Sequence, residues 1–516
     1  MAGLISPAAP AHYPAGQSPS GLVEGSAIQS QVNRWPILAV ITLGTFMTAL
    51  DASIVNIALP SIAQAFGSAL TGAVEWVIIG YLVVIAALLL TIGRLADLIG
   101  RTSLWIAGLV IFTLGSAVCG AAPSLIVLIA ARGLQGIGSA CLLATGLAIV
   151  SDTFDRGERG RALGINTIAI ALGASAGPTL GGLIVEHIDW RWIFYVNLPV
   201  GILAVLASRR YLPHPRARQA GHFDAPGAVL LGVAIGGLNL GLSFGQEWGW
   251  ISLPLIGTLV VSIGALVAAA IHERRTPAPL LDLTLFRSRT FSSALLSLVC
   301  AMLALFAVGF LLPFYFEELR GFSTQEAGFL LTPFSITIAV VGPIAGSLAD
   351  RYGSRWLAPL GMAIMIAGLL MLTRLSATSS LPEMIAPLVV SGLGQGLFLS
   401  PNSNALLAAT PQAEQGQASG ILATGRVIGQ SLSVAVAGAV FASLGGAMAG
   451  MSLIAVRGAS SQPEFMELET TFLNALHAAI LVCAGFAVLG LIASMLRGPE
   501  PHHLPGDPSS TRSAGE

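Results

Sequence analysis

The sequence has little charge and no lysine. Only 9% of its 516 residues are Asp, Glu, Lys or Arg, whereas a soluble globular protein carries about 25%. All 24 basic residues are arginine, which excludes a P-loop and lysine Schiff-base or pyridoxal chemistry. The net charge of −1 gives no reason to expect a nucleic-acid partner. With 54% hydrophobic residues, the chain is expected to be a polytopic membrane protein.

Cysteines and catalytic motifs are equally scarce. The four cysteines (Cys119, Cys141, Cys300 and Cys483) all lie inside apolar runs, without a CxxC spacing or a histidine neighbour. They predict buried packing rather than a metal site or a disulfide framework. No HExxH, GxSxG or paired-carboxylate motif occurs in a loop. We therefore expect no enzyme, no metal and no cofactor.

Fourteen apolar runs are long enough to cross a bilayer, which takes about 20 residues. They fall near residues 36–59, 74–90, 103–119, 125–150, 162–184, 192–207, 225–244, 253–271, 291–316, 327–348, 357–372, 385–408, 418–444 and 472–496. The tails 1–33 and 499–516 are rich in small residues and proline, and we expect them to be disordered and cytoplasmic.

The arginines predict the orientation of these spans. If both termini are cytoplasmic, most arginines fall in cytoplasmic segments, as the positive-inside rule requires. Four fall on the outer side: Arg191, Arg320, Arg374 and Arg457. Two more, Arg132 and Arg426, fall within spans. We expect a multi-pass protein of a bacterial cytoplasmic membrane, with both termini inside.

An internal repeat divides the chain into two halves. The segment GRLADLIG that begins at Gly93 recurs as GSLADRYG from Gly346, and Gln135-Gly136 recurs as Gln395-Gly396. GRALG at 160–164 recurs as GQASG at 416–420 with nearly the same spacing. The repeat predicts a bundle of six helices at 34–212, two inserted helices at 213–285 and a second six-helix bundle at 286–498. Two related six-helix halves are typical of secondary transporters.

Several motifs resemble those of the major facilitator superfamily, specifically its fourteen-helix drug:proton antiporters of the EmrB/QacA type. They are LDASIVNIALP (50–60), GRLADLIGR (93–101), RGLQGIGSA (132–140), GASAGPTLGG (173–182), WRWIFYVNLP (190–199) and LLDLTLFRSRTF (280–291). The resemblance implies an all-α major facilitator fold with two six-helix bundles and two inserted helices. It also implies transport by alternating access.

Asp51 and Arg132 are the candidate proton-coupling residues. Their positions along their spans place both roughly 12–14 Å deep, so the two side chains share a layer. Asp51 is the only acidic residue well inside a span, and a charge at that depth is costly unless it is paired or faces water. A carboxylate there can take a proton from one side and release it to the other. The alternative is a buried salt bridge that only fixes two helices.

A glycine stripe marks the fifth span. Gly173, Gly177 and Gly181 recur every four residues, with Pro178 and Gly182 beside them. Small residues at this spacing allow close helix approach, and proline bends a helix. The resemblance implies a flexing seam between the halves that limits leak. Ordinary tight packing is the alternative.

Two loops carry candidate cytoplasmic gating residues. The first copy comprises Gly93, Arg94, Asp97, Gly100 and Arg101. The second copy has Asp350 and Arg351, with Ser354 in place of the first copy's Arg101. In the resembled family such a cluster latches the cytoplasmic side in the outward-facing state. A plain positive-inside topology signal is the alternative.

Arg426 and Gln135 are candidates for lining a substrate cavity. Arg426 could instead bond backbone carbonyl groups of neighbouring helices. No second acid lies deep in the spans of the second half, which favours neutral, monocationic or amphiphilic substrates over divalent cations.

These observations predict an exporter of lipophilic drugs, antibiotics or other toxic compounds, driven by the proton gradient. Its expected partners are the small substrate, protons and the lipid bilayer, and the sequence leaves an accessory efflux protein open. A metabolite uniporter or proton symporter of the same fold is the alternative. The glycine motif and the single deep acid argue against it.

Overall fold

The computed structural model describes residues 34–67, 72–154, 156–212, 224–276, 284–410, 415–456 and 462–497, and these are helical, with no strand among them. The predicted tails lie outside this part of the chain. The first half contains α1 (Arg34–Ala65), α2 (Gly72–Ile99), α3 (Arg101–Gly120), α4 (Leu125–Thr153), α5 (Arg156–His187), α6 (Trp192–Tyr195) and α7 (Asn197–Tyr211). The inserted helices are α8 (Ala225–Trp248) and α9 (Leu253–Arg275). The second half contains η1 (Leu285–Arg287), α10 (Arg289–Phe314), the π-helical turn η2 (Tyr315–Leu319), α11 (Thr324–Tyr352), α12 (Ser354–Leu372), α13 (Leu381–Ala408), α14 (Gln415–Ser443), α15 (Gly446–Val456) and α16 (Gln462–Met495).

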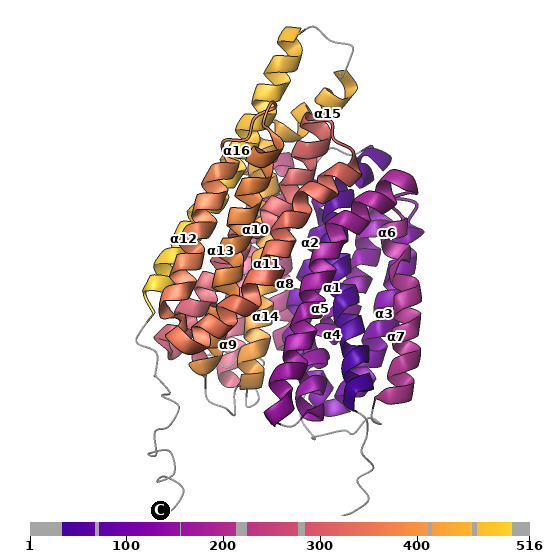
Figure 1. The fold of residues 1–516 in the computed structure, drawn as a ribbon, viewed down its shortest axis with the longest axis vertical. Coiled ribbons are helices and arrows are strands. Elements are labelled where there is room, and N and C mark those ends of the chain that lie inside the picture. The colour runs from indigo at the N-terminus through magenta and orange to yellow at the C-terminus, as the bar shows by residue number, and fades with distance from the viewer. Residues whose placement is uncertain are drawn as a thin grey trace, which may run out of the picture.

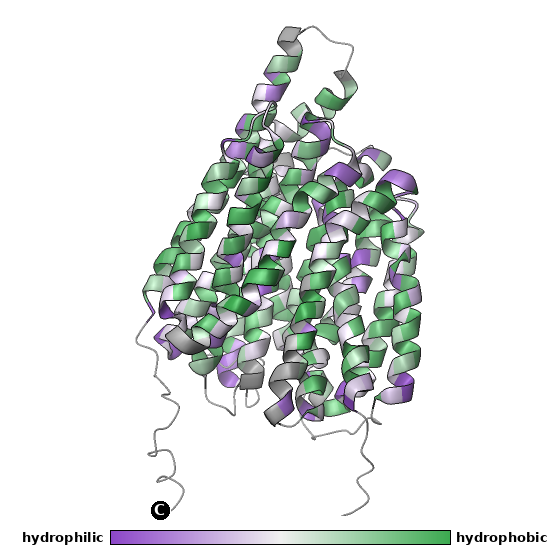
Figure 2. Ribbon diagram, viewed as in Figure 1, coloured by the Kyte–Doolittle hydropathy of each residue, from purple (hydrophilic) through white to green (hydrophobic). Residues whose placement is uncertain are grey.

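The described residues contain thirteen helical stretches that are long and apolar enough to span a membrane. Helix α2 adds a fourteenth with the shorter apolar stretch Ala73–Leu89. The short helix α6 continues into α7, and together they form the single stretch Trp192–Tyr211. In Figure 2 hydrophobic residues cover the length of the bundle and hydrophilic ones gather toward its two ends. The all-helical membrane fold predicted from the sequence is confirmed.

Helix α15 is an element that the sequence analysis did not predict. It has 11 residues, too few to cross a bilayer, and it packs against α16. Helix α16 has 34 residues, about 51 Å at 1.5 Å per residue, so it exceeds a hydrocarbon core of about 30 Å. In Figure 1 both helices project beyond the rest of the bundle at its upper end.

The two halves repeat one packing scheme. In the first half α1 packs on α5, and α4 packs on α2 and α3; in the second half α10 packs on α14, and α13 packs on α11 and α12. The domain boundary predicted at residue 285 falls inside η1, and those at 33, 212 and 498 border segments outside the described residues. The exact domain limits therefore stay predictions.

Helix α1 begins and α16 ends at the lower end of the molecule in Figure 1. We call this the termini end, and we call the upper end of the molecule the opposite end. The halves meet where α5 packs on α11 and where α2 packs on α14. We call these contacts the α5/α11 seam and the α2/α14 seam. The close approaches described below lie where α5 ends and α11 begins, and where α2 begins and α14 ends, which is the opposite end.

Candidate functional site

Asp51 of α1 and Arg132 of α4 form a buried ion pair. Arg132 Nη1 donates to Asp51 Oδ2 at 2.7 Å, and the side chains are 0% and 1% exposed. The structure thus brings together the two charges that the sequence placed at one depth. Because a charge buried without a partner costs several kcal/mol, each residue makes the other tolerable in this position.

Two amides complete the surroundings of the Asp51 carboxylate. Gln135 Nε2 and Asn197 Nδ2 both donate to Asp51 Oδ1, at 2.8 and 2.9 Å. The carboxylate therefore accepts three hydrogen bonds from α4 and α7. Hydrogen bonds to an ionised acceptor are about twice as strong as neutral ones, so these donors fix the position of the carboxylate in the present conformation.

The Arg132 guanidinium has partners on all sides. Its Nε donates to the carbonyl of Val77 at 2.9 Å, and Nη1 also contacts Gln135 Oε1. Its carbon Cζ lies 4.1 Å from the centre of the Tyr81 ring, a cation–π distance. The Tyr81 hydroxyl donates to Ser139 Oγ at 2.8 Å. Helix α2 therefore holds the arginine in place through a backbone carbonyl and an aromatic face.

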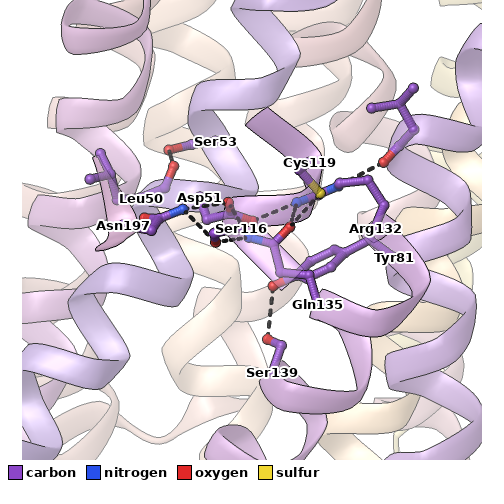
Figure 3. A network of polar contacts seen from close by, with 11 residues as sticks. Leu50, Asp51, Ser53, Tyr81, Ser116, Cys119, Arg132, Gln135, Ser139 and Asn197 are labelled. Atoms are coloured by element: carbon purple, nitrogen blue, oxygen red, sulfur yellow. Dashed lines mark hydrogen bonds and ion pairs between the residues drawn. The ribbon is translucent and has the colours of Figure 1, made fainter. Parts of the chain in front are cut away.

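Ser116 of α3 links the two amides. Its Oγ accepts from Gln135 Nε2 at 2.7 Å and from Asn197 Nδ2 at 3.3 Å. Figure 3 shows that these polar side chains converge from α1, α2, α3, α4 and α7, all helices of the first half. We call this set the Asp51 network; it comprises Asp51, Tyr81, Ser116, Arg132, Gln135, Ser139 and Asn197.

The network differs from the expectation in two respects. Gln135, predicted as a cavity residue, is 0% exposed and uses its amide group within the network. Asn197, Ser116 and Tyr81 were not singled out as site residues. Only the fold could identify them, because many polar residues punctuate these helices and their sequence positions do not show which of them face Asp51.

The glycine stripe of α5 packs against a helix of its own half. Gly173, Gly177 and Gly181 face α1 of the same half, where a Cβ on Gly173 would lie 2.6 Å from the Phe46 carbonyl. The stripe is therefore not the contact between halves that the sequence suggested. Small residues predict a close neighbour but not which helix provides it.

Pro178 and Gly182, on another side of α5, do lie on the α5/α11 seam. A Cβ on Gly182 would lie 2.6 Å from the carbonyl oxygen of Thr324, and a Cβ on Gly328 would clash with the Pro178 carbonyl. Thr179 Oγ1 and Thr332 Oγ1 form a hydrogen bond of 2.6 Å across the same contact. Backbone thus packs directly on backbone where the two halves meet.

The α2/α14 seam has its own close contact. Glu75, buried near the start of α2, lies against Gly438 of α14, where any Cβ would clash with the carboxylate. Two further acids lie in η2, at the end of the span that α10 begins: Glu318 is buried and Glu317 is half-buried. Glu318 lies against Gly450 of α15.

The structure describes the side chains of only some of the predicted gating residues. Arg101 Nη1 forms an ion pair of 2.8 Å with Asp152 Oδ2, a residue of α4 that the sequence analysis did not name. Gly100 and Gly353 occupy equivalent turns of the two halves, and both have positive φ (99° and 81°) that favours glycine. A Cβ added to Gly93 would meet no described atom within 4 Å, and Arg94 Nε has no hydrogen-bond partner among the described residues. The side chains of Asp97, Asp350 and Arg351 lie outside the described set.

Arg426, the other predicted cavity residue, is half-buried on α14. Its Nε is buried and has no hydrogen-bond partner in the described part of the chain. The described residues contain no group of three or more His, Cys, Asp or Glu side chains that could hold a metal ion. All four cysteines are buried and free.

Membrane-length helices in two similarly packed bundles define the class of this molecule as a polytopic membrane transporter. A family model described as Major Facilitator Superfamily matches residues 41–331 and 294–515. The chain belongs to the Major Facilitator Superfamily, whose drug-efflux members include several of its relatives.

The chain is 38% identical over 417 residues to the multidrug resistance protein Stp of Mycobacterium tuberculosis, covering 80% of this chain and 77% of Stp. It is 36% identical to the riboflavin transporter RibZ of Clostridioides difficile, covering 79% and 88%. It is 32% identical to the tetracenomycin C resistance and export protein of Streptomyces glaucescens, covering 82% and 79%. Among solved structures, a bacterial homologue of the human lysosomal transporter Spinster aligns with a TM-score of 0.65 at 16% identity, covering 91% of this chain and 97% of the other.

Proposed function

We propose that this transporter exports lipophilic drugs or other toxic compounds in exchange for protons, by alternating access. The observation that carries the proposal is the Asp51–Arg132 pair, buried in the membrane interior of one half. Ionisable residues inside membrane spans are costly and commonly mark proton or substrate pathways. The names of Stp and of the tetracenomycin C export protein support drugs and antibiotics as the substrate class.

Protonation of Asp51 would alter the contacts that tie five helices together. A neutral carboxyl accepts hydrogen bonds less strongly, so its attraction for Arg132 and for the two amides would weaken. Asn197 Oδ1 is buried without a hydrogen-bond partner among the described residues. After a flip of its amide, that oxygen would accept a hydrogen bond from a protonated Asp51. The network therefore has an arrangement available for each protonation state.

Access to Asp51 requires a change of conformation. The carboxylate has no exposed surface, and the halves are in contact at the opposite end through both seams. We propose that parting of these seams and rearrangement of the network alternate, with substrate and proton carried in opposite directions. No cofactor is needed, since the proton gradient supplies the energy.

The location and partners follow the same proposal. We place the protein in a bacterial cytoplasmic membrane with both termini cytoplasmic, so that the termini end faces the cytoplasm. Its substrates are small, lipophilic, and neutral or cationic. An accessory efflux protein at the opposite end is an additional partner that the proposal allows.

A metabolite transporter is the second candidate, since the relative RibZ is named as a riboflavin transporter. The direction of transport distinguishes the metabolite transporter from the drug exporter. An efflux-deficient host expressing the protein should accumulate less of a lipophilic dye, and a protonophore should abolish the difference. Concentrative uptake of a metabolite, with protons moving inward alongside it, would favour the second candidate and overturn the first.

A further inference from the structure

Helix α8 packs against both α2 and α14, one helix from each half, while α9 packs on α8. A Cβ on Gly232 of α8 would lie 3.3 Å from Ala87 Cβ of α2, and Asn239 of α8 bonds Ser431 of α14. The inserted pair therefore covers the α2/α14 seam.

The two seams differ in how many large apolar side chains their helices expose. Large apolar residues are exposed along the helices of the α5/α11 seam, among them Leu172 of α5 (58%) and Val340 of α11 (57%). Among the described residues of α2 and α14, the only exposed large apolar side chain is Ile99, at the end of α2. Shielding by α8 and α9 accounts for the difference, because α9 is itself among the most exposed of the apolar helices.

The contacts of α8 with its two neighbours differ in kind. Toward α14 it makes a directional bond between fully buried groups: Ser431 Oγ donates to Asn239 Oδ1 at 2.7 Å, while Asn239 Nδ2 donates to the Ile235 carbonyl. Without water to replace it, such a bond is costly to break. Two polar residues at facing positions of membrane helices commonly hold them together in this way.

Toward α2 the surface of α8 is small and apolar. Gly232 lies on Ala87, where an added Cβ would be slightly tight at 3.3 Å, and Gly236 lies on Val83, where it would be at an ordinary van der Waals distance of 3.5 Å. Near the opposite end, Trp76 and Phe244 stack with their ring centres 6.4 Å apart. These contacts are not directional hydrogen bonds, so one helix can shift along the other without leaving a buried polar group unpaired.

We infer that α8 and α9 move as part of the second half, held by the Asn239–Ser431 bond, and slide over α2 as a permanent cover of the α2/α14 seam. The inference rests on the alternating-access cycle proposed above. When Glu75 and Gly438 separate, α8 cannot keep its place on both α2 and α14. It remains on α14, and the parted seam stays shielded from lipid.

Crosslinks across each contact test this assignment. The variants are Asn239→Cys/Ser431→Cys for α8–α14 and Ala87→Cys/Gly232→Cys for α8–α2, each joined by the same short, reducible bis-methanethiosulfonate reagent. Gly237→Cys/Ser262→Cys is the matched control within the insertion, since a Cβ on Gly237 would lie 3.5 Å from Ser262 Cβ. The wild-type protein, with four buried cysteines, controls for the reagent.

The readout is hydrogen–deuterium exchange at residues 324–332, on the α5/α11 seam, with export measured in parallel. The α8–α14 crosslink and the control should leave exchange within about twofold of the reduced protein, whereas the α8–α2 crosslink should slow it about tenfold by holding one conformation. Equal slowing by both crosslinks, or none by the α8–α2 crosslink, would overturn the inference. If the crosslinks give the expected exchange pattern but the protein exports no compound, the result counts against the proposed function and not against the assignment of α8.

Ser431→Ala gives a second test that needs no crosslink. Removing the hydroxyl should speed exchange in residues 225–248 about tenfold relative to residues 101–120 of α3, because α8 loses its tie to α14. Unchanged exchange in α8 would contradict the assignment even if the Asn239→Cys/Ser431→Cys variant failed to fold.

Discussion

Asn197 of α7 and Gln135 of α4 donate to the same oxygen of Asp51, Oδ1, while Arg132 holds the other oxygen. The carboxylate is therefore bound by one charged and two neutral donors. This division lets the contribution of charge be separated experimentally from that of hydrogen bonding, since each donor can be changed alone.

Asn197→Leu should weaken the network without removing either charge. The variant loses one hydrogen bond to an ionised group, which contributes about 1.5–3 kcal/mol. We expect reduced thermal stability in detergent and slower export per folded molecule. Asn402→Leu, which replaces a buried asparagine of α13 outside the Asp51 network, is the matched control, and it should leave the pH dependence of export unchanged. An Asn197→Leu variant with wild-type stability and pH dependence would contradict the role given to this residue.

Gly182→Ala should obstruct closure of the opposite end. Its new Cβ would lie 2.6 Å from the Thr324 carbonyl oxygen, a backbone atom that cannot move aside cheaply. We expect export to fall about tenfold, in line with a shift of about 1.4 kcal/mol away from the closed state. Gly264→Ala on α9, where an added Cβ meets nothing within 4 Å, is the control. Equal export rates in the two variants would argue against a tight seam at this position.

The Arg101–Asp152 ion pair should contribute little to stability. Both side chains are partly exposed, at 26% and 40%, and exposed pairs give about 0.2–1 kcal/mol. A double-mutant cycle with Arg101→Ala and Asp152→Ala, followed by thermal unfolding, measures the coupling. If the pair acts as a gate, the variants should nevertheless change the ratio of the export rates at high and low substrate concentration. A cycle with no coupling in stability or transport would remove the pair from the gating cluster.

Reporter fusions test the orientation. Fusions at Gly3, at Gly221 and after Arg497 should all report a cytoplasmic location if the termini end faces the cytoplasm. The balance of arginines across the predicted loops is the physical reason. An extracytoplasmic signal at any one of these positions would contradict the proposed topology.

The spans could be predicted from the sequence because apolar runs of membrane length have few alternative structures. The Asp51–Arg132 pair could also be predicted, because two charges within membrane spans must find partners. Asn197 and Ser116 were not, since uncharged polar residues occur on many helices and helix rotation decides which of them meet. The glycine stripe predicted close packing but the wrong neighbour, and α15 was missed because 11 apolar residues fit a loop as well as a helix.

The consequence of removing the Asp51 charge depends on what the pair does. Asp51→Asn leaves Arg132 buried without a counter-ion in either case, which costs about 3–5 kcal/mol and reduces the amount of folded protein. If the pair only fixes helices, the molecules that do fold should keep gradient-driven export. If Asp51 couples protons, the asparagine can still bond Gln135 and Asn197, but it cannot titrate. The two roles therefore predict losses in different quantities.

Proton-driven export per folded molecule in Asp51→Asn is the most direct test of the account. The variant should be compared with wild-type protein and with Glu383→Gln, an exposed acid of α13 outside the network, in vesicles carrying a defined pH gradient and equal amounts of folded transporter. We predict that Asp51→Asn loses export driven by the gradient and retains substrate binding, while Glu383→Gln keeps gradient-driven export. Gradient-driven export at the wild-type rate by well-folded Asp51→Asn would contradict the assignment of Asp51 as the proton-coupling residue.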